Sequence, residues 1–395
     1  MANTFKFGNG NWAVKDGYAL AYNDENNNFK PLPFDFTRAS SATRVNKQGL
    51  VETVGSGKPR IDFTDNTSGH LLLEPSRTNN LPYAEQFDNA AWSKGNSTVT
   101  ANQAISPDGS QTADLLQLTS AGGNVFDGVG GSGDYAFSVF AKYVDAQFIR
   151  LRSTGSYAYF DIQNGSVGST INVSSTKIED YGNGWYRCTV VGNNTNSLAQ
   201  IFVSDTDGSN TGTGSVYIWG AMFEAGSYAT SYIPTEGSSV TRSAETANGA
   251  GNSTVFNDSE GVLYAEFSAL ANDSTTRVIT INDTSNQLTE RVQLFILGTS
   301  MKGRVTDGGV TQGEVSGTPT LTDNNKIAFK YKANDFALWI NGVEVDTSSS
   351  GSTPSGLDTI RFDAGTGGSP FYGNFKDIKV YNTALTDTEL QNLTS

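Results

Sequence analysis

The acidic pair Glu344 and Asp346 is the feature of the sequence that most directly suggests chemistry. Hydrolysis of a glycosidic bond uses two carboxyl groups at a fixed separation, and Glu-x-Asp on a regular strand places both on one face. A complete Glu-x-Asp-x-Glu pattern would have a third acid at position 348, which is Ser348. The solvated outer face of an antiparallel hairpin is the simpler explanation. We therefore expect no catalytic residues and no enzyme activity.

The single histidine and the single cysteine limit other kinds of reaction. A Ser-His-Asp or Cys-His site would have to use His70, which enters an apolar run in "TSGHLLLEP" and is expected to be structural. Cys188 cannot form a disulfide within the chain, which is typical of proteins that fold where thiols stay reduced. Asp205–Asn210 begins like a calcium loop, but its glycine is fourth rather than sixth. These residues predict no cofactor and no metal site.

A sugar-binding site needs fewer specific residues than a catalytic or metal site does. A pyranose presents an apolar C–H face and a rim of hydroxyl groups, so an aromatic ring beside Asn, Asp, Gln or Arg suits it. Trp339 is expected to point outward beside Glu344, and Trp92 and Tyr157 lie near turns. These four residues are the candidates for glycan contact. Packing between domains or between subunits is the alternative for each ring.

The composition excludes several classes of partner. Of the 395 residues only 17% are charged and 43 are Gly, which is typical of short strands joined by many turns. The net charge of -14 argues against nucleic acid, because phosphate contacts need clustered Lys and Arg. It also argues against anionic membrane surfaces, and no run is long enough for membrane insertion. The N-terminus lacks the basic and apolar regions of a signal peptide.

Residues 81–245 are predicted to form a first β-sandwich, because short apolar strands alternate with Gly-rich turns at regular intervals. In "SVYIWGAMFE" the apolar residues occupy both phases, so we expect a central strand that is covered on both faces. Strict alternation would place Ile218 and Met222 on one face and Trp219 and Phe223 on the other.

Residues 246–395 are predicted to form a second sandwich. In "FALWINGVEVD" the dipeptide Asn341-Gly342 is typical of a type I′ hairpin turn. This turn sets Ile340 opposite Val343 and would align Leu338 with Val345 on one continuous apolar face.

The remaining segments complete the predicted organisation. Residues 1–35 are aromatic and are expected to form an extended arm that packs on another body, followed by a β connector at 36–80. Arg38, Arg44, Arg60 and Arg77 of the connector region are expected to be partly buried, with Asp35, Asp62 and Glu74 as available partners. Thr386 and Glu389 predict a capping box that begins a short C-terminal helix. The predicted fold class is all-β, with two antiparallel jelly-roll β-sandwiches in tandem.

Several stretches resemble bacteriophage virion proteins of the fibre and tail type. "FDFTRASSATRVNKQGLVETV", "PRIDF" and "LLLEPSRTNNLPYAEQFDNAAW" are similar to the leader region of those proteins. "SPDGSQTAD", "GNGWYRCTV" and "YIWGAMFEAGSYATSYIPT" resemble the carbohydrate-binding-module-like jelly roll that follows it. "WINGVEV" and "FKDIKVYNTALTDTELQNL" resemble the closing strands of a laminin-G-like, concanavalin A-like sandwich. The opening "FGNGNWAVKDGYALAYNDENNNFKPLPFDFTR" is similar to openings in phages of Bacteroidetes hosts, including the crAss-like group.

The resemblance implies a head or tail fibre or decoration protein, made in the host bacterial cytoplasm, displayed on the virion surface and often a homotrimer. Its lectin-like domains would bind host-surface or mucosal glycans in host adhesion. Residues 1–35 would anchor the protein to capsid or tail proteins, through Phe5, Phe7, Trp12, Tyr18 and Tyr22. Two alternatives stay open, namely a polysaccharide depolymerase of the virion and a decoration protein without a ligand.

Overall fold

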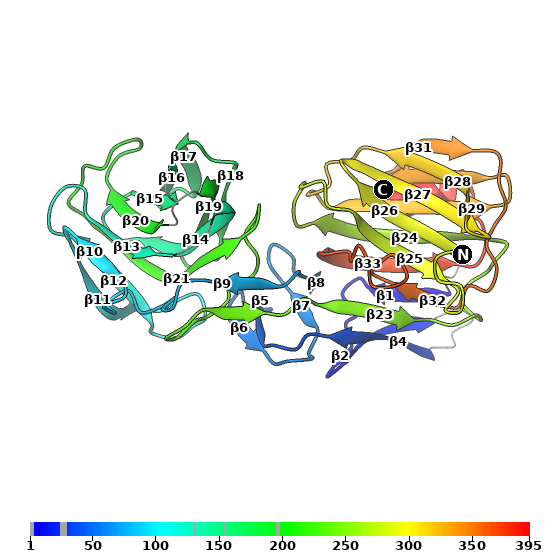
Figure 1. Ribbon diagram of the computed structural model, residues 1–395, viewed down its shortest axis with the longest axis horizontal. Coiled ribbons are helices and arrows are strands. Elements are labelled where there is room, and N and C mark those ends of the chain that lie inside the picture. The colour runs from blue at the N-terminus through cyan, green and yellow to red at the C-terminus, as the bar shows by residue number, and fades with distance from the viewer. Residues whose placement is uncertain (1–3, 24–29, 130–131, 154, 195–197) are drawn as a thin grey trace. The chain divides into compact units, whose positions relative to one another are not determined.

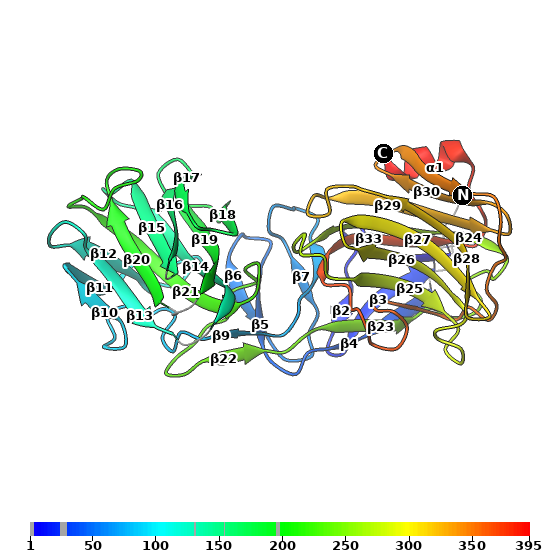
Figure 2. The same cartoon turned by 45° about the horizontal axis from the view of Figure 1, so that its top comes forward.

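The chain forms two compact units, each assembled from segments that are distant in sequence. The computed structural model describes residues 4–23, 30–129, 132–153, 155–194 and 198–395. Unit 1 comprises Met1–Ala39, Gly55–Pro75 and Ala244–Ser395, and unit 2 comprises Ser40–Val54 and Ser76–Ser243. The predicted all-β class is confirmed, because antiparallel sheets form the sandwiches and the described chain ends in a short helix (Figures 1 and 2).

Unit 1 is a sandwich made from two runs of antiparallel strands. The first run is β2 (Val14–Lys15), β3 (Tyr18–Asn23), β4 (Lys30–Thr37), β23 (Thr246–Ala250), β32 (Thr359–Arg361), β25 (Arg277–Asn282), β26 (Arg291–Leu297), β27 (Ser300–Asp307) and β28 (Val310–Gly317). The second run is β7 (Arg60–Asp62), β8 (His70–Leu73), β33 (Gly373–Tyr381), β24 (Glu260–Ala269), β29 (Asn325–Lys332), β30 (Phe336–Ile340) and β31 (Val343–Ser348). β1 (Phe5–Gly8) pairs with both β3 and β33 and joins the two runs.

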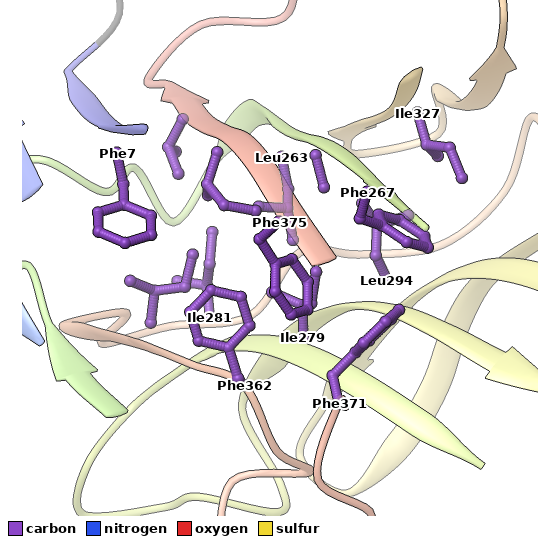
Figure 3. Packing of buried hydrophobic residues seen from close by; sticks show 14 of the residues in the cluster. Phe7, Leu263, Phe267, Ile279, Ile281, Leu294, Ile327, Phe362, Phe371 and Phe375 are labelled. Carbon is purple, nitrogen blue, oxygen red and sulfur yellow. The ribbon is translucent and has the colours of Figure 1, made fainter. Parts of the chain in front are cut away.

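Apolar side chains from both runs fill the interior of unit 1 (Figure 3). Ile279 and Ile281 of β25 are fully buried in the same cluster as Phe375 of β33, because alternate residues of each strand point into the sandwich. The ring centroids of Phe362 and Phe375 lie 4.4 Å apart. This apolar interior between two sheets is the expected source of the stability of the unit.

The N-terminal segment is part of this core, which corrects the prediction of a separate arm at residues 1–35. β1 pairs with β33 from Phe5–Val380 to Gly8–Asp377. Alternation along "FKF" turns Phe5 and Phe7 inward, and they are 0% and 2% exposed. The ring of Phe7 lies 5.1 Å from that of Phe34 on β4. Because these rings are in the hydrophobic core, the segment stabilises unit 1.

A buried ion network ties together the three segments of unit 1. The carboxylate of Glu245 accepts hydrogen bonds from Arg38 Nη1 at 2.7 Å and from Arg60 Nε at 2.8 Å. Arg60 Nη2 also donates to Glu74 Oε2 at 2.8 Å, and the backbone N–H of Glu74 donates to Glu245 at 3.0 Å. All four side chains are buried. Glu74 was among the predicted partners, whereas Glu245 comes from a distant part of the sequence.

Unit 2 is built on two six-stranded antiparallel sheets. The first sheet is β10 (Ser93–Gly95), β13 (Asn124–Gly128), β20 (Leu198–Ser204), β15 (Phe148–Ser153), β16 (Ser156–Asp161) and β17 (Ser166–Ile171). The second sheet is β11 (Ser97–Ala104), β12 (Ala113–Leu118), β21 (Ser215–Ala225), β14 (Gly133–Tyr143), β19 (Trp185–Asn194) and β18 (Ser175–Asp180). Two two-stranded antiparallel sheets accompany them: β5 (Ala42–Val45) with β6 (Val51–Val54), and β9 (Arg77–Asn79) with β22 (Val240–Arg242). The predicted connector at 36–80 is therefore divided between the two units.

β21 is the central strand that the sequence predicts, but its faces are not those of a regular strand. Ile218 and Phe223 pack in the core between the two sheets, whereas Trp219 and Met222 pack in a second apolar cluster. The register of β21 against β14 shifts at this point, and Gly220 has a φ of 62°. A bulge at this glycine therefore reverses the alternation, which corrects the predicted faces.

The predicted type I′ hairpin is confirmed at the turn and differs beyond it. Asn341 and Gly342 have φ values of 49° and 82°, and Ile340 pairs with Val343. A register shift then aligns Leu338 with Asp346 rather than with Val345. The predicted C-terminal helix is also confirmed as α1 (Asp387–Thr394), with Thr386 and Glu389 forming its capping box.

Candidate ligand-binding face

The outer face of the first sheet of unit 2 carries two rows of side chains that are suited to ligand contact. Core residues such as Leu151 and Ile201 point toward the second sheet, so their neighbours in each strand point away from it. β13, β20, β15 and β16 lie side by side (Figure 2). One row is Asn124, Phe202, Arg150 and Tyr159, and the next is Phe126, Gln200, Arg152 and Tyr157. We call these eight residues the arginine–aromatic face.

Arg150 occupies the centre of the arginine–aromatic face. Its guanidinium carbon lies 3.7 Å from the ring centroid of Phe202, 5.0 Å from that of Tyr157 and 5.8 Å from that of Tyr159. The residue is only 7% exposed. Its Nε is enclosed and has no hydrogen-bond partner among the described residues. The aromatic rings therefore hold the cation in place without neutralising its charge.

Amide and hydroxyl groups surround this cation. Gln200 Nε2 donates to Asn124 Oδ1 at 2.8 Å, which fixes the orientation of both amides. Gln200 Oε1 is buried and has no partner among the described residues. Tyr159 donates its hydroxyl to Asn210 Oδ1 at 2.8 Å. The face thus combines fixed polar groups with an acceptor whose hydrogen-bonding capacity is unused.

The electrostatic environment disfavours the charge that Arg150 carries. Burial lowers the pKa of the Arg150 guanidinium below its ordinary value, the Tyr159 hydroxyl opposes that shift, and the positive charge of Arg152 adds to it. No carboxylate of the described residues forms an ion pair with Arg150. Asp161 lies two residues after Tyr159 on β16, and its carboxylate accepts hydrogen bonds from Gln147 and Asn164 instead. An anionic group placed on the face would relieve this unfavourable environment.

The exposed part of the arginine–aromatic face can contact both sides of a sugar. Phe126, Arg152 and Tyr157 are half-buried, so part of each side chain is exposed at the surface. An aromatic ring binds the apolar C–H face of a pyranose, while Arg and amide groups bind its hydroxyls. Nothing in this arrangement supplies a pair of acids or a nucleophile with an adjacent base. The chemistry that it supports is binding.

Of the four predicted glycan contacts, Tyr157 lies on this face and the two tryptophans do not reach solvent. Trp92 is 1% exposed, and its Nε1 donates to the carbonyl of Tyr83 at 2.8 Å. Trp339 does point away from the main core, as alternation predicts, but it is only 7% exposed because Leu385 and Leu390 cover it. The expectation that Trp339 is outward-facing and available is therefore wrong. Glu344 is exposed and pairs with Trp339 across the hairpin.

The acidic pair on β31 does not form a catalytic arrangement. Glu344 aligns with Trp339, and Asp346 aligns with the preceding residue of β30, Leu338, because of the register shift. Asp346 Oδ2 accepts from the backbone N–H of Ser316 on β28 at 2.8 Å. The expectation that both acids share one face is wrong, because the extra residue in β31 breaks the alternation between them.

The residues predicted to anchor the protein have several environments. Phe5 and Phe7 are buried in unit 1, and Trp12 is half-buried with its Nε1 donating to Ser68 O at 2.7 Å. Tyr18 is 38% exposed and lies beside Lys15, whose Nζ is 4.9 Å from its ring centroid. The side chain of Tyr22 lies outside the described part of the structure.

Sequence reasoning missed most of the arginine–aromatic face. The strands "AQFIRLRST", "YAYFDIQNG" and "AQIFVSD" are readable one by one, and each has polar or aromatic residues in alternate positions. The signal that was missing is their order in the sheet, since β15 pairs with β20 across about fifty residues of sequence. Only that pairing brings Arg150, Phe202 and Gln200 together.

Three further features bear on other kinds of site. Among the described residues, no group of three or more His, Cys, Asp or Glu side chains is arranged to hold a metal ion. In the described ranges, no helix is long and apolar enough to cross a membrane. A hollow of about 730 Å³ lies beside the β30–β31 turn, lined by Asp323, Asn341, Val343 and Val345 among others. The Asn341 amide there donates to Asn325, so it is already engaged within the protein.

The C-terminal region of unit 1 is similar in sequence to a known family. Residues 251–391 match the family described as the concanavalin A-like lectin/glucanases superfamily. This region of unit 1 is therefore similar to concanavalin A-like, laminin-G-type domains. No curated protein gives a significant match to the sequence.

Solved structures share parts of this architecture. A sialidase carbohydrate-binding module (CBM40) from Ruminococcus gnavus is 18% identical, with a TM-score of 0.31, and the match covers 38% of this chain and 94% of the module. A pentraxin from Limulus polyphemus is 11% identical, with a TM-score of 0.29, covering 34% and 70% of the two chains. Domain 4 of the arabinanase AbnA from Geobacillus stearothermophilus, solved with arabinotriose, is 15% identical, with a TM-score of 0.27, covering 38% and 73%. None of these similarities carries an argument about a ligand of this chain.

Proposed function

We propose that the protein binds glycans through the arginine–aromatic face of unit 2 and catalyses no reaction. The observation that carries the proposal is the pair of cross-strand rows centred on Arg150, in which rings and fixed polar groups share one sheet face. The second sheet of unit 2 is covered on its outer side by an apolar cluster that includes Val51 and Tyr232. The first sheet instead presents polar and aromatic groups, as a sugar-binding surface does.

A glycan array followed by calorimetry on the purified chain tests this proposal. Replacing Tyr157 with Ala removes a half-buried ring from the face and is expected to weaken binding to any glycan hit about tenfold or more. Tyr143→Ala is the matched control, because Tyr143 is a 37% exposed tyrosine on the second sheet. Equal affinity of the Tyr157→Ala variant and the wild type would remove this face from consideration.

The absence of enzyme activity is part of the same proposal. The alternative, a polysaccharide depolymerase that uses Glu344 and Asp346, is weakened because the two acids have separate environments. Incubation of host-type polysaccharides with the wild type should release no reducing ends. Release that disappears in Glu344→Gln would support the depolymerase instead.

We also propose a place for the protein on the surface of a virion, as a head or tail fibre or decoration protein in host adhesion. The support is the resemblance of its leader, jelly-roll and closing stretches to phage virion proteins. Mass spectrometry and antibody labelling of purified particles should find the chain on their surface, and light scattering should report a homotrimer. Particles without the chain would contradict the proposal, and labelled particles that bind no glycan would favour decoration alone.

The anchoring role of residues 1–35 needs a test other than deletion. Deletion would remove β1, β2, β3 and most of β4, including the buried Phe5 and Phe7, so loss of incorporation would follow from misfolding. Tyr18→Ala changes an exposed residue of the same segment and leaves the core intact. Reduced incorporation of this folded variant into particles would support a contact with capsid or tail proteins.

A further inference from the structure

We infer that the glycan bound by the arginine–aromatic face carries a carboxylate, and that the guanidinium of Arg150 receives it. The inference rests on the proposed glycan-binding function and specifies the chemical class of the ligand. Uronic and sialic acids are the sugars that carry such a group.

The Arg150 side chain is buried without forming an ion pair with a carboxylate of the described residues. Arg150 is 7% exposed and lies against the rings of Phe202, Tyr157 and Tyr159, and its guanidinium also interacts with the Tyr159 hydroxyl. Transfer of a cation out of water is costly unless an opposite charge or hydrogen bonds compensate for it. The enclosed Nε lacks a hydrogen-bond partner among the described residues. The site is therefore incomplete with respect to charge and hydrogen bonding.

The neighbouring charges favour an anion from outside the chain. Arg152 lies on the same face, so two guanidinium groups are directed to one surface of the sheet. The nearest acid along β16, Asp161, accepts from Gln147, from Asn164 and from two backbone N–H groups. The hydrogen bonds of its carboxylate are thereby made with these groups and not with Arg150. A protein with a net charge of -14 nonetheless has a positive centre on this face.

Arg304 of unit 1 also stacks on an aromatic ring, but it has a carboxylate partner within the chain. Its guanidinium lies 4.6 Å from the ring centroid of Phe295, and it forms an ion pair of 2.5 Å with Glu314. Arg150 has the ring and lacks the carboxylate. Because a planar guanidinium binds a carboxylate through two parallel hydrogen bonds, a sugar acid supplies the group that Glu314 supplies to Arg304.

An array of uronic- and sialic-acid oligosaccharides, each printed beside its carboxyl methyl ester, tests the inference on the intact wild-type chain. The ester keeps the shape of the sugar and removes its charge. The expected result is binding of the free acids at least about tenfold tighter than the esters. Equal binding of acids, esters and neutral glycans would overturn the inference and leave the proposed function standing. Binding to no glycan would overturn both.

Variants of the arginine give a second, independent readout. Arg150→Met keeps an apolar side chain over Phe202 and is expected to abolish the preference for acid over ester. Arg150→Lys keeps the charge without the planar fork and should retain part of the preference. Arg304→Met is the matched control, because that arginine already has its carboxylate. A wild-type preference that persists in Arg150→Met would show that another group receives the carboxylate, and the assignment to Arg150 would be wrong.

Discussion

The buried carboxylate of Glu245 is expected to be a main determinant of the stability of unit 1. It accepts hydrogen bonds from Arg38, from Arg60 and from the backbone N–H of Glu74, and its side chain is fully buried. Burial by itself would lower the pKa of Arg60, but the carboxylates of Glu245 and Glu74 raise it above its ordinary value. The negative charges of these acids therefore compensate for the burial of the two arginines.

Glu245→Gln keeps the size of the side chain and removes its charge. An amide has one acceptor oxygen, and its NH2 group would face N–H donors of Arg60 or Glu74. Arg38 and Arg60 would each lose their ion pair with Glu245, and Arg60 would keep its ion pair with Glu74. Removal of one partner from a buried ion pair costs about 3–5 kcal/mol, so we expect a decrease of that size in the free energy of unfolding of unit 1.

Urea unfolding followed by hydrogen-exchange mass spectrometry measures this effect for each unit. Peptides from β23 and β33 should lose protection at lower urea, while peptides from β14 and β21 should keep the wild-type transition, since they belong to unit 2. Glu52→Gln is the matched control. The Glu52 side chain is 37% exposed in its ion pair with Arg44, so its loss should cost less than about 1 kcal/mol.

Two results would refute this reasoning. A cost below about 1 kcal/mol for Glu245→Gln would mean that the buried charges are compensated by other groups. A similar loss of protection in both units would mean that the effect is not local to the network. The double variant Arg38→Met/Glu245→Gln should recover part of the loss, because it removes one uncompensated cation.

Three further predictions concern unit 1. Leu390→Ala should release α1 from the sheet, at a cost of about 2–5 kcal/mol in the free energy of unfolding for that contact. The same change should expose Trp339, which would appear as a red shift of tryptophan fluorescence. An unshifted spectrum would contradict this packing. Burial lowers the pKa of His70, so the unfolded chain takes up a proton near pH 6.5 that the folded unit does not. Stability should therefore be complete above that pH and decline as the pH falls below it, and His70→Gln should flatten that decline in urea titrations. Gly342→Ala introduces a side chain at a φ of 82° and should lower the urea midpoint by an amount equivalent to about 1 kcal/mol, whereas no change would argue against the type I′ turn.

Local features of the fold were predictable from the sequence because neighbouring residues determine them. The Asn341-Gly342 turn and the capping box of α1 each depend on a few adjacent residues, and both are confirmed. The apolar character of β21 on both faces was also predictable. Its actual faces were not, because one positive-φ glycine introduces a bulge whose position depends on the pairing with β14.

Features that depend on pairing between distant segments could not be predicted. Phe7 pairs with Ile378, so nothing close to Phe7 in the sequence indicates that it belongs to the core of unit 1. The same reason explains the tryptophans, since Trp339 is exposed or buried according to whether α1 covers it. On the arginine–aromatic face, the pattern of each strand was readable, and the order of the strands was not.

The contrast between Arg150 and Arg304 gives a criterion for recognising a binding arginine on a β-sheet. Stacking on a phenylalanine occurs at both residues and by itself fits a structural role. The two differ in compensation, because Glu314 completes the contacts of Arg304 within the chain and no carboxylate of the described residues does so for Arg150. A folded protein retains an uncompensated buried cation at a cost in stability. Binding of an anionic ligand recovers that cost, so the cost itself favours association with such a ligand at this face over association with a neutral one.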